Sequence, residues 1–147
     1  MPVAVPLLVA VTAQILCQIF KVVAYSIRDH RFSPHYFTTA GGMPSSHSAF
    51  VTALAVSVGI ARGFDSELFA VAFVFSAIVI YDAYRLRGHV EKQAEVLNRL
   101  QQHLPAEERE ELSEMVGHSV REIAAGIAVG AVFAVAVSAA FAAAGLG

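Results

Sequence analysis

The stretch VREIAAGIAVGAVFAVAVSAAFAAAGL, residues 120–146, decides the class of fold. After Glu122 it carries no charged side chain, and it is long enough to cross the hydrocarbon core of a bilayer, which takes about 20 helical residues. The chain of 147 residues is 56% hydrophobic, with mean hydropathy +0.61. Only 15% of its residues are charged, against roughly 25% in soluble domains. These features disfavour a soluble all-α bundle and predict an all-α integral membrane helical bundle.

Four apolar stretches predict about four transmembrane helices in a single membrane domain, residues 1–147. The first stretch lacks a basic leading segment and a clear cleavage site, so we interpret it as a retained helix and not as a signal peptide. Four short spans make a thin bundle, which is compatible with a homo-oligomer. The expected spans are about 3–27, 46–61, 67–81 and 120–146.

The segment 85–118 is the extended polar part of the chain. Apolar residues recur at helical spacing from Val90 to Leu100, and Pro105 interrupts the pattern. A second amphipathic helix is expected over Ala106–Val116, with acidic residues in its first turn. The segment therefore predicts an amphipathic helical hairpin at the membrane surface.

The basic residues predict the orientation in the membrane. With four spans, segments 28–45 and 82–119 lie on one side, and the termini lie on the other side with the turn 62–66. Nine of the ten lysines and arginines belong to the first side or its edge, and Arg62 alone belongs to the second. By the positive-inside rule, both long polar segments face the cytoplasm. We expect a protein of the cytoplasmic membrane with both termini on the opposite side.

A glycine-rich turn runs into an apolar helix in the segment Gly41-Gly42-Met43-Pro44-Ser45-Ser46-His47-Ser48-Ala49-Phe50. A helix N-terminus has unpaired amide N–H groups and a positive partial charge, so it suits a phosphate. Ser45 and Ser46 add hydroxyl donors, and His47 can exchange a proton near neutral pH. A plain capped helix start is the alternative, and the segment alone does not decide between them.

A polar stripe follows one face of the first span and includes Lys21 and Arg28, two turns apart. Ionisable groups at membrane depth usually face a bundle interior or a wet cavity. Arg28 alone is better explained by snorkelling to the interface. Lys21 lies deeper, with Gln14 and Gln18 on the same stripe, and is expected to point inward.

The last span begins at Gly117-His118-Ser119-Val120-Arg121-Glu122. Ser119 and Glu122 fit a capping box, in which the two side chains bond each other's backbone amides. His118 then lies at a helix entrance on the same membrane side as His47. Two helix N-termini, two histidines and two cations of the first span therefore converge, which favours a phosphate site.

These residues resemble the divergent branch of the type 2 phosphatidic acid phosphatase family, related to acid phosphatases and vanadium-dependent haloperoxidases. Lys21 and Arg28 match the family's first motif, although Asp29 replaces its proline. The second motif is matched by Pro44, Ser45 and His47, with Ser46 in place of glycine. The third is matched by His118, Glu122 and Gly126, with Glu in place of Asp.

The third motif's arginine is missing, because its position holds Leu112. The divergent branch instead carries a signature matched by Asp82-Ala83, Arg87, Gln93-Ala94 and Leu97-Asn98. Arg87 is the first candidate for the replacement phosphate ligand and Arg85 the second. Asp82 could pair with either arginine and orient it, or form an ordinary helix ion pair.

The resemblance implies metal-independent hydrolysis of a phosphate ester through a phosphohistidine, with no cofactor. His118 would be the nucleophile, Glu122 its orienting carboxylate, and His47 the acid that protonates the leaving group. The implied phosphate-binding residues are Lys21, Arg28, Ser45, Ser46 and Arg87.

Two classes of function therefore stand. The first is a membrane lipid-phosphate phosphatase acting on a phosphatidate-like or polyprenyl phosphate or diphosphate. The second is a non-catalytic membrane protein that binds a phosphorylated lipid or partner, favoured by Leu112, Asp29 and Glu122. A net charge of −2 without a basic patch indicates no nucleic-acid partner.

Overall fold

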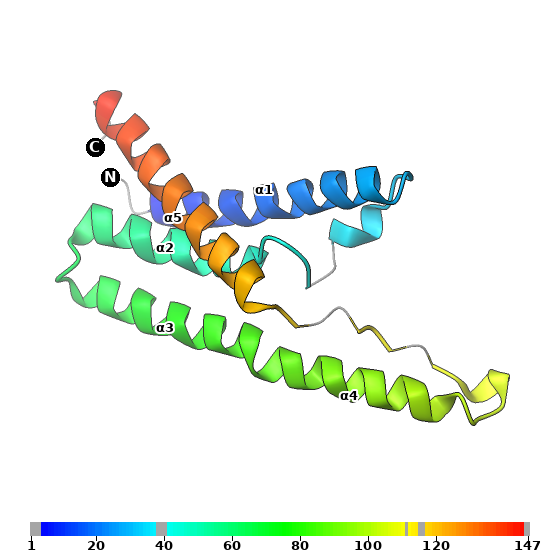
Figure 1. Ribbon diagram of the computed structural model, residues 1–147. Helices are drawn as coiled ribbons and strands as arrows, with labels where there is room; N and C mark the ends of the chain where they lie inside the picture. The colour runs from blue at the N-terminus through cyan, green and yellow to red at the C-terminus, as the bar shows by residue number, and fades with distance from the viewer. Residues whose placement is uncertain (1–3, 38–40, 111, 115–116, 146–147) are drawn as a thin grey trace.

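The structure, a computed structural model, describes residues 4–37, 41–110, 112–114 and 117–145 (Figure 1). It confirms the predicted all-helical membrane bundle. The helices are α1 (Val5–Arg28), α2 (Ser46–Arg62), α3 (Glu67–Tyr84), α4 (Leu86–Gln101) and α5 (Val120–Ala143), with short 3-10 turns η1 (Pro34–Phe37) and η2 (Ala106–Glu108). The expected spans fall on α1, α2, α3 and α5, and the outermost expected residues, Val3 and Leu146, lie outside the described part of the chain.

Helix α2 is the central element of the bundle and packs against α1, α3 and α5. Small residues, among them Gly126 and Gly130 of α5, allow this close approach. A Cβ atom on Gly126 would collide with the Ser45 carbonyl, and one on Gly130 with the Ala49 carbonyl. One turn further, Ala53 and Ala134 belong to the same buried apolar cluster.

Three described helical segments are long and apolar enough to cross a membrane: α1, the continuous run Glu67–Gln101, and α5. Helix α2 has 17 residues, a rise of about 25 Å at 1.5 Å per residue, which is at the short end of the spanning range. The outer faces carry exposed apolar side chains such as Phe20, Phe73 and Val132. Their exposure is expected where the surrounding solvent is lipid.

Both described chain ends lie at the same end of the bundle as the turn between α2 and α3 (Figure 1). The loop between α1 and α2, helix α4 and the segment that leads into α5 extend toward the other end. This arrangement brings the N-termini of α2 and α5 together near the junction of α3 and α4.

The expected helical hairpin over 85–118 is wrong in its second half. Helix α4 continues α3 almost without interruption, with only Arg85 between them. After η2, residues 109, 110 and 112–114 are not helical, and Glu111, Met115 and Val116 of the expected helix lie outside the described residues. The reason is long-range: the Asn98 amide of α4 donates to the Leu112 carbonyl (2.9 Å) and accepts from the Leu112 N–H (3.0 Å). These bonds hold the returning chain against α4 and compete with a helix of its own.

Candidate functional site

The N-terminus of α2 is capped from within. The Ser45 Oγ accepts a hydrogen bond from the Ser48 N–H (3.3 Å), and the Ser48 hydroxyl lies 3.0 Å from the same oxygen. Ser45, Ser46 and Ser48 are completely buried. Ser45 therefore serves as the cap, while the Ser46 Oγ has no hydrogen-bond partner among the described residues.

Lys21 of α1 points inward and is 1% exposed. Its Nζ donates to the Gly41 carbonyl at 3.1 Å, which ties α1 to the glycine turn before α2. The next residue, Gly42, has φ +91° and lies against the ring of Tyr25, so a Cβ atom would collide with it. The Tyr25 hydroxyl oxygen accepts from the Met43 N–H at 3.2 Å. This turn requires glycine for both its backbone conformation and the close approach.

The N-terminus of α5 carries His118 in a buried position. The predicted capping box is present: Glu122 N–H donates to Ser119 Oγ (3.3 Å), and Ser119 N–H donates to Glu122 Oε2 (2.9 Å). The same Glu122 oxygen lies 3.3 Å from His118 Nδ1. Glu122 therefore caps the helix and orients the imidazole, and with Nδ1 as donor the other nitrogen, Nε2, carries the free lone pair.

The two helix entrances are joined directly, because the Ser45 N–H donates to the Glu122 carbonyl at 3.0 Å. His47 interacts electrostatically with His118, Lys21, Arg87 and Asp82. Among the described residues, His118 Nε2 and His47 Nδ1 are buried and have no hydrogen-bond partner. Buried polar atoms are normally paired, so these two nitrogens and the Ser46 hydroxyl indicate a place for a polar ligand.

Burial lowers the pKa of His118 below the usual histidine range. The hydrogen bond to Glu122 raises it in part, and the charges of Lys21 and Arg87 lower it further. Neutral imidazole is the form that can act as a nucleophile near pH 7.

Arg28 lies at the outer edge of the candidate site, and its side chain is 62% exposed. Its Nε donates to Asp29 Oδ1 at 3.0 Å, and its guanidinium lies over the Tyr25 ring, 4.5 Å from the centroid. The other Asp29 oxygen accepts from the Tyr36 hydroxyl at 2.9 Å. Asp29 occupies the position at which the family that this sequence resembles has proline. It therefore binds Arg28, the arginine of the first motif.

Of the two candidate replacement arginines, Arg87 is the one bound to Asp82, with Nε 3.3 Å from Oδ2. Its charge acts on both His47 and His118. Arg85 instead lines a polar cavity of about 510 Å³ together with His118 and Glu122. Arg87 therefore acts on both histidines, and Arg85 lines the cavity beside His118.

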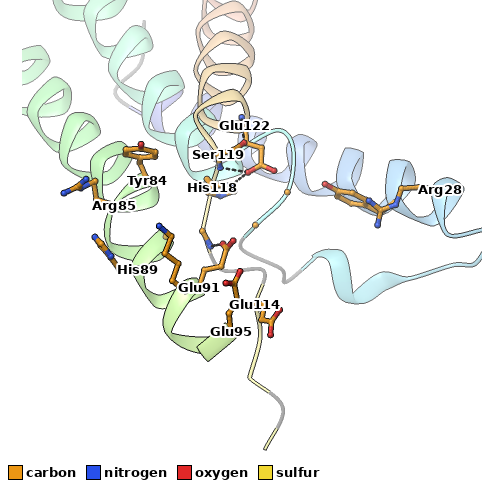
Figure 2. A pocket seen from close by; sticks show the side chains of 16 residues that line it. Arg28, Tyr84, Arg85, His89, Glu91, Glu95, Glu114, His118, Ser119 and Glu122 are labelled. Atoms are coloured by element: carbon orange, nitrogen blue, oxygen red, sulfur yellow. Dashed lines mark hydrogen bonds and ion pairs between the residues drawn. The ribbon is translucent and has the colours of Figure 1, made fainter. Parts of the chain in front are cut away.

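Figure 2 shows this polar cavity, with His118, Ser119 and Glu122 at the entrance of α5. Arg85 and His89 lie on the α3–α4 side, and Glu91, Glu95 and Glu114 gather between α4 and the segment that returns to α5. Arg28 stands apart on α1. Sequence reasoning missed Tyr84, His89 and this acidic group as cavity residues.

Glu91 makes a contact that could not be foreseen from its position on an amphipathic helix. Its Oε2 accepts from the Gly117 N–H at 2.8 Å, immediately before His118. Gly117 also packs closely on Gly88 of α4, where a Cβ atom would meet backbone. Helix α4 therefore holds the backbone that carries His118. The only sequence signal is the glycine next to the histidine.

Leu112, at the position of the missing arginine, serves a different purpose. Its backbone forms both bonds to the Asn98 amide, and Asn98 Nδ2 also lies 2.8 Å from Glu114 Oε1. Asn98 is the last residue of the divergent signature, which gives that signature a structural role. No group of three or more His, Cys, Asp or Glu side chains in the described part of the chain is arranged to hold a metal ion.

Residues 4–133 match the model of the family described as the divergent PAP2 family. The chain belongs to the divergent PAP2 family. It is also 44% identical over 95 residues to the uncharacterized membrane protein YuiD of Bacillus subtilis (strain 168), an alignment that covers 65% of this chain and 60% of that relative. No solved structure matches the chain.

Family membership and the apolar helices identify a helical membrane protein of the divergent PAP2 family. The match includes all the candidate site residues, from Lys21 to Glu122, while the chain spans less than two thirds of the curated relative's length.

Proposed function

We propose that the protein is a metal-independent membrane phosphatase that hydrolyses a phosphate monoester or diphosphate of a lipid, phosphatidate-like or polyprenyl. The observation that carries the proposal is the orientation of His118. Its Nδ1 lies 3.3 Å from the Glu122 carboxylate, and its Nε2 is buried without a partner among the described residues. That arrangement is the triad-like pairing of a nucleophile with an orienting group.

In the proposed reaction, His118 Nε2 attacks phosphorus and the bond from phosphorus to the ester oxygen breaks. Protonated His47 gives its proton to the leaving oxygen, so the lipid departs as an alcohol, or as a monophosphate from a diphosphate. Water then attacks phosphorus, His47 accepts its proton, and the nitrogen–phosphorus bond breaks to release inorganic phosphate. Glu122 stabilises the imidazolium character of His118 during the first step.

The phosphoryl oxygens are held by cations and hydroxyl groups around the two helix entrances. Buried Lys21 and Asp82-bound Arg87 act electrostatically on the two histidines, which supports their role as ligands. Ser46 offers an unpaired buried hydroxyl, and the capped Ser45 fixes the amides of the α2 entrance. Arg28, at the rim, meets the incoming phosphate first.

The nine-to-one division of basic residues supports a site that faces the cytoplasm, with lipid substrate entering from the inner leaflet. The second candidate function, binding of a phosphorylated lipid without turnover, is favoured by one observation: Arg28 is engaged by Asp29. An arginine already paired would bind phosphate more weakly than a free one.

Phosphate release by purified protein tests the proposal. Phosphatidate and a polyprenyl diphosphate are offered in mixed micelles with EDTA, to wild type, His118→Ala and His103→Ala. We expect turnover by wild type, inhibition by vanadate, and a loss of at least about a thousandfold in His118→Ala, since removing a nucleophile abolishes the covalent route. The exposed His103 serves as a matched control and its variant keeps wild-type activity. Saturable lipid binding without phosphate release would support the second function instead.

A further inference from the structure

Two apolar grooves adjoin the polar cavity at His118, and we propose that they hold the two hydrocarbon chains of one phospholipid, one on each side of α5. This inference rests on the proposed function, because it assigns the substrate class. The substrate is then a two-chain phosphatidate-like lipid and not a single-chain polyprenyl phosphate.

The first groove, here the α1 groove, has a volume of about 560 Å³ and lies between α1 and α5. Leu16, Phe20 and Val129 form its apolar walls, and Met43 and Pro44 of the turn before α2 close one side. Phe20 is 58% exposed, so this groove opens on the outer surface of the bundle, which faces lipid.

The second groove, here the α3 groove, has a volume of about 710 Å³ and is bounded by α2, α3 and α5. Phe73, Ala77 and Ile127 are among its walls. Phe73 is 59% exposed, so this groove is also open toward lipid. Both grooves can therefore receive a hydrocarbon chain laterally from the bilayer.

Each groove is joined to the polar cavity by shared wall residues. Tyr25 and Arg28 line both the polar cavity and the α1 groove. Tyr84 lines both the polar cavity and the α3 groove. Tyrosine and arginine combine an apolar body with a polar end, which suits the junction between a headgroup and its chains.

The register of α5 separates the two grooves. Ala125 and Val129 face the α1 groove, whereas Ile123 and Ile127 face the α3 groove. Residues two apart on a helix point about 200° apart, so these are different faces. A lipid whose phosphate lies beside His118, at the start of α5, would straddle the helix with one chain on each face. A single chain would leave one groove unused.

Filling each groove separately tests this arrangement. Ala125→Phe fills the α1 groove and Ala77→Phe fills the α3 groove. Ala128→Phe is the matched control, since Ala128 lies on α5 but lines neither groove. With dioleoyl phosphatidate, we expect each filling variant to lose at least about tenfold in kcat/KM. With the one-chain lysophosphatidate, each single variant stays within about threefold of wild type because the other groove remains open, and the double variant loses activity.

A binding measurement keeps the inference separate from turnover. Phosphatidate analogues with a photoreactive group on one chain or the other are crosslinked to His118→Ala and mapped by mass spectrometry. Labels in both grooves support the inference even if wild type releases no phosphate, in which case the proposed function fails alone. Labels confined to one groove, or a wild-type preference for polyprenyl phosphate over phosphatidate, would overturn it.

Discussion

At the scale of single residues, His118 is held from two directions. Glu122 orients its ring through Nδ1, and Glu91 of α4 holds the backbone just before it through the Gly117 N–H. The first contact is local, because Glu122 lies four residues from His118, whereas Glu91 lies 26 residues from Gly117. The position of the imidazole therefore depends on α4 as well as on α5.

Glu91 is a positioning residue by this account, and its role is to accept a hydrogen bond. Glu91→Ala removes a bond of about 1 kcal/mol and should lower kcat about five- to tenfold, with little change in KM. It should also speed hydrogen exchange at the Gly117 amide. Glu91→Gln keeps an acceptor oxygen and should restore both values. If the glutamine variant behaves like the alanine variant, the charge of Glu91 matters and the positioning role is wrong.

The lowered pKa of His118 predicts a stability that depends on pH. The unfolded histidine titrates near pH 6.5, and the folded one below it, because burial opposes the charged form. The folded state therefore binds fewer protons than the unfolded state in acid, so the stabilisation is present above pH 6.5 and is lost as pH falls through the folded pKa. The Tm in detergent should decline in that range, and less so in His118→Gln. Equal declines in both proteins would contradict this assignment.

At the scale of elements, local chemistry predicted where the helices begin and long-range contacts decided the rest. Ser45 and the Ser119–Glu122 capping box are local signals, and α2 and α5 begin beside them. The expected helix over Ala106–Val116 failed because Asn98 pairs with Leu112, 14 residues away. No periodicity in the sequence reports a contact of that kind.

Two glycines give contrasting predictions for the stability of the bundle: Gly126 lies in the contact of α5 with α2, and Gly88 lies in α4. Gly126→Ala places a methyl group against the Ser45 carbonyl and should destabilise the bundle by about 1–3 kcal/mol. A methyl group added by Gly88→Ala in α4 meets nothing within 4 Å, so this change should be neutral or stabilise by up to about 1 kcal/mol. Thermal unfolding in detergent measures both. A neutral Gly126→Ala would mean that the two helices are further apart than described.

At the scale of the whole molecule, composition predicted the helical membrane bundle, while the shape of the site came from the fold. Lys21 was expected to point inward and is buried against the Gly41 carbonyl. Arg28 was expected to reach the phosphate or the interface, and its pairing with Asp29 at the rim leaves that role as a proposal. Tyr84 and His89 could not be inferred as cavity residues. They line the cavity because α4 continues α3 almost without interruption, and the sequence does not indicate that continuation.

The orientation itself is a prediction for the intact protein in its membrane. Both termini should lie outside the cytoplasm, and the end of α4 with η2 inside it. A fusion of alkaline phosphatase after Gly147 should be active, while green fluorescent protein at the same point should be dark. The reverse pattern should appear for insertions at 104–106. Cytoplasmic fluorescence from the C-terminal fusion would contradict the four-span arrangement and the proposed side of the site.

The most direct test of the central claim is detection of the phosphorylated enzyme. Wild type is mixed with phosphatidate labelled with ³²P in the phosphate group, quenched in alkali and digested for mass spectrometry. The account predicts an alkali-stable, acid-labile label on His118 that chases to inorganic phosphate and is missing from His118→Asn. Turnover without any label on His118, or a label on another residue, would contradict it.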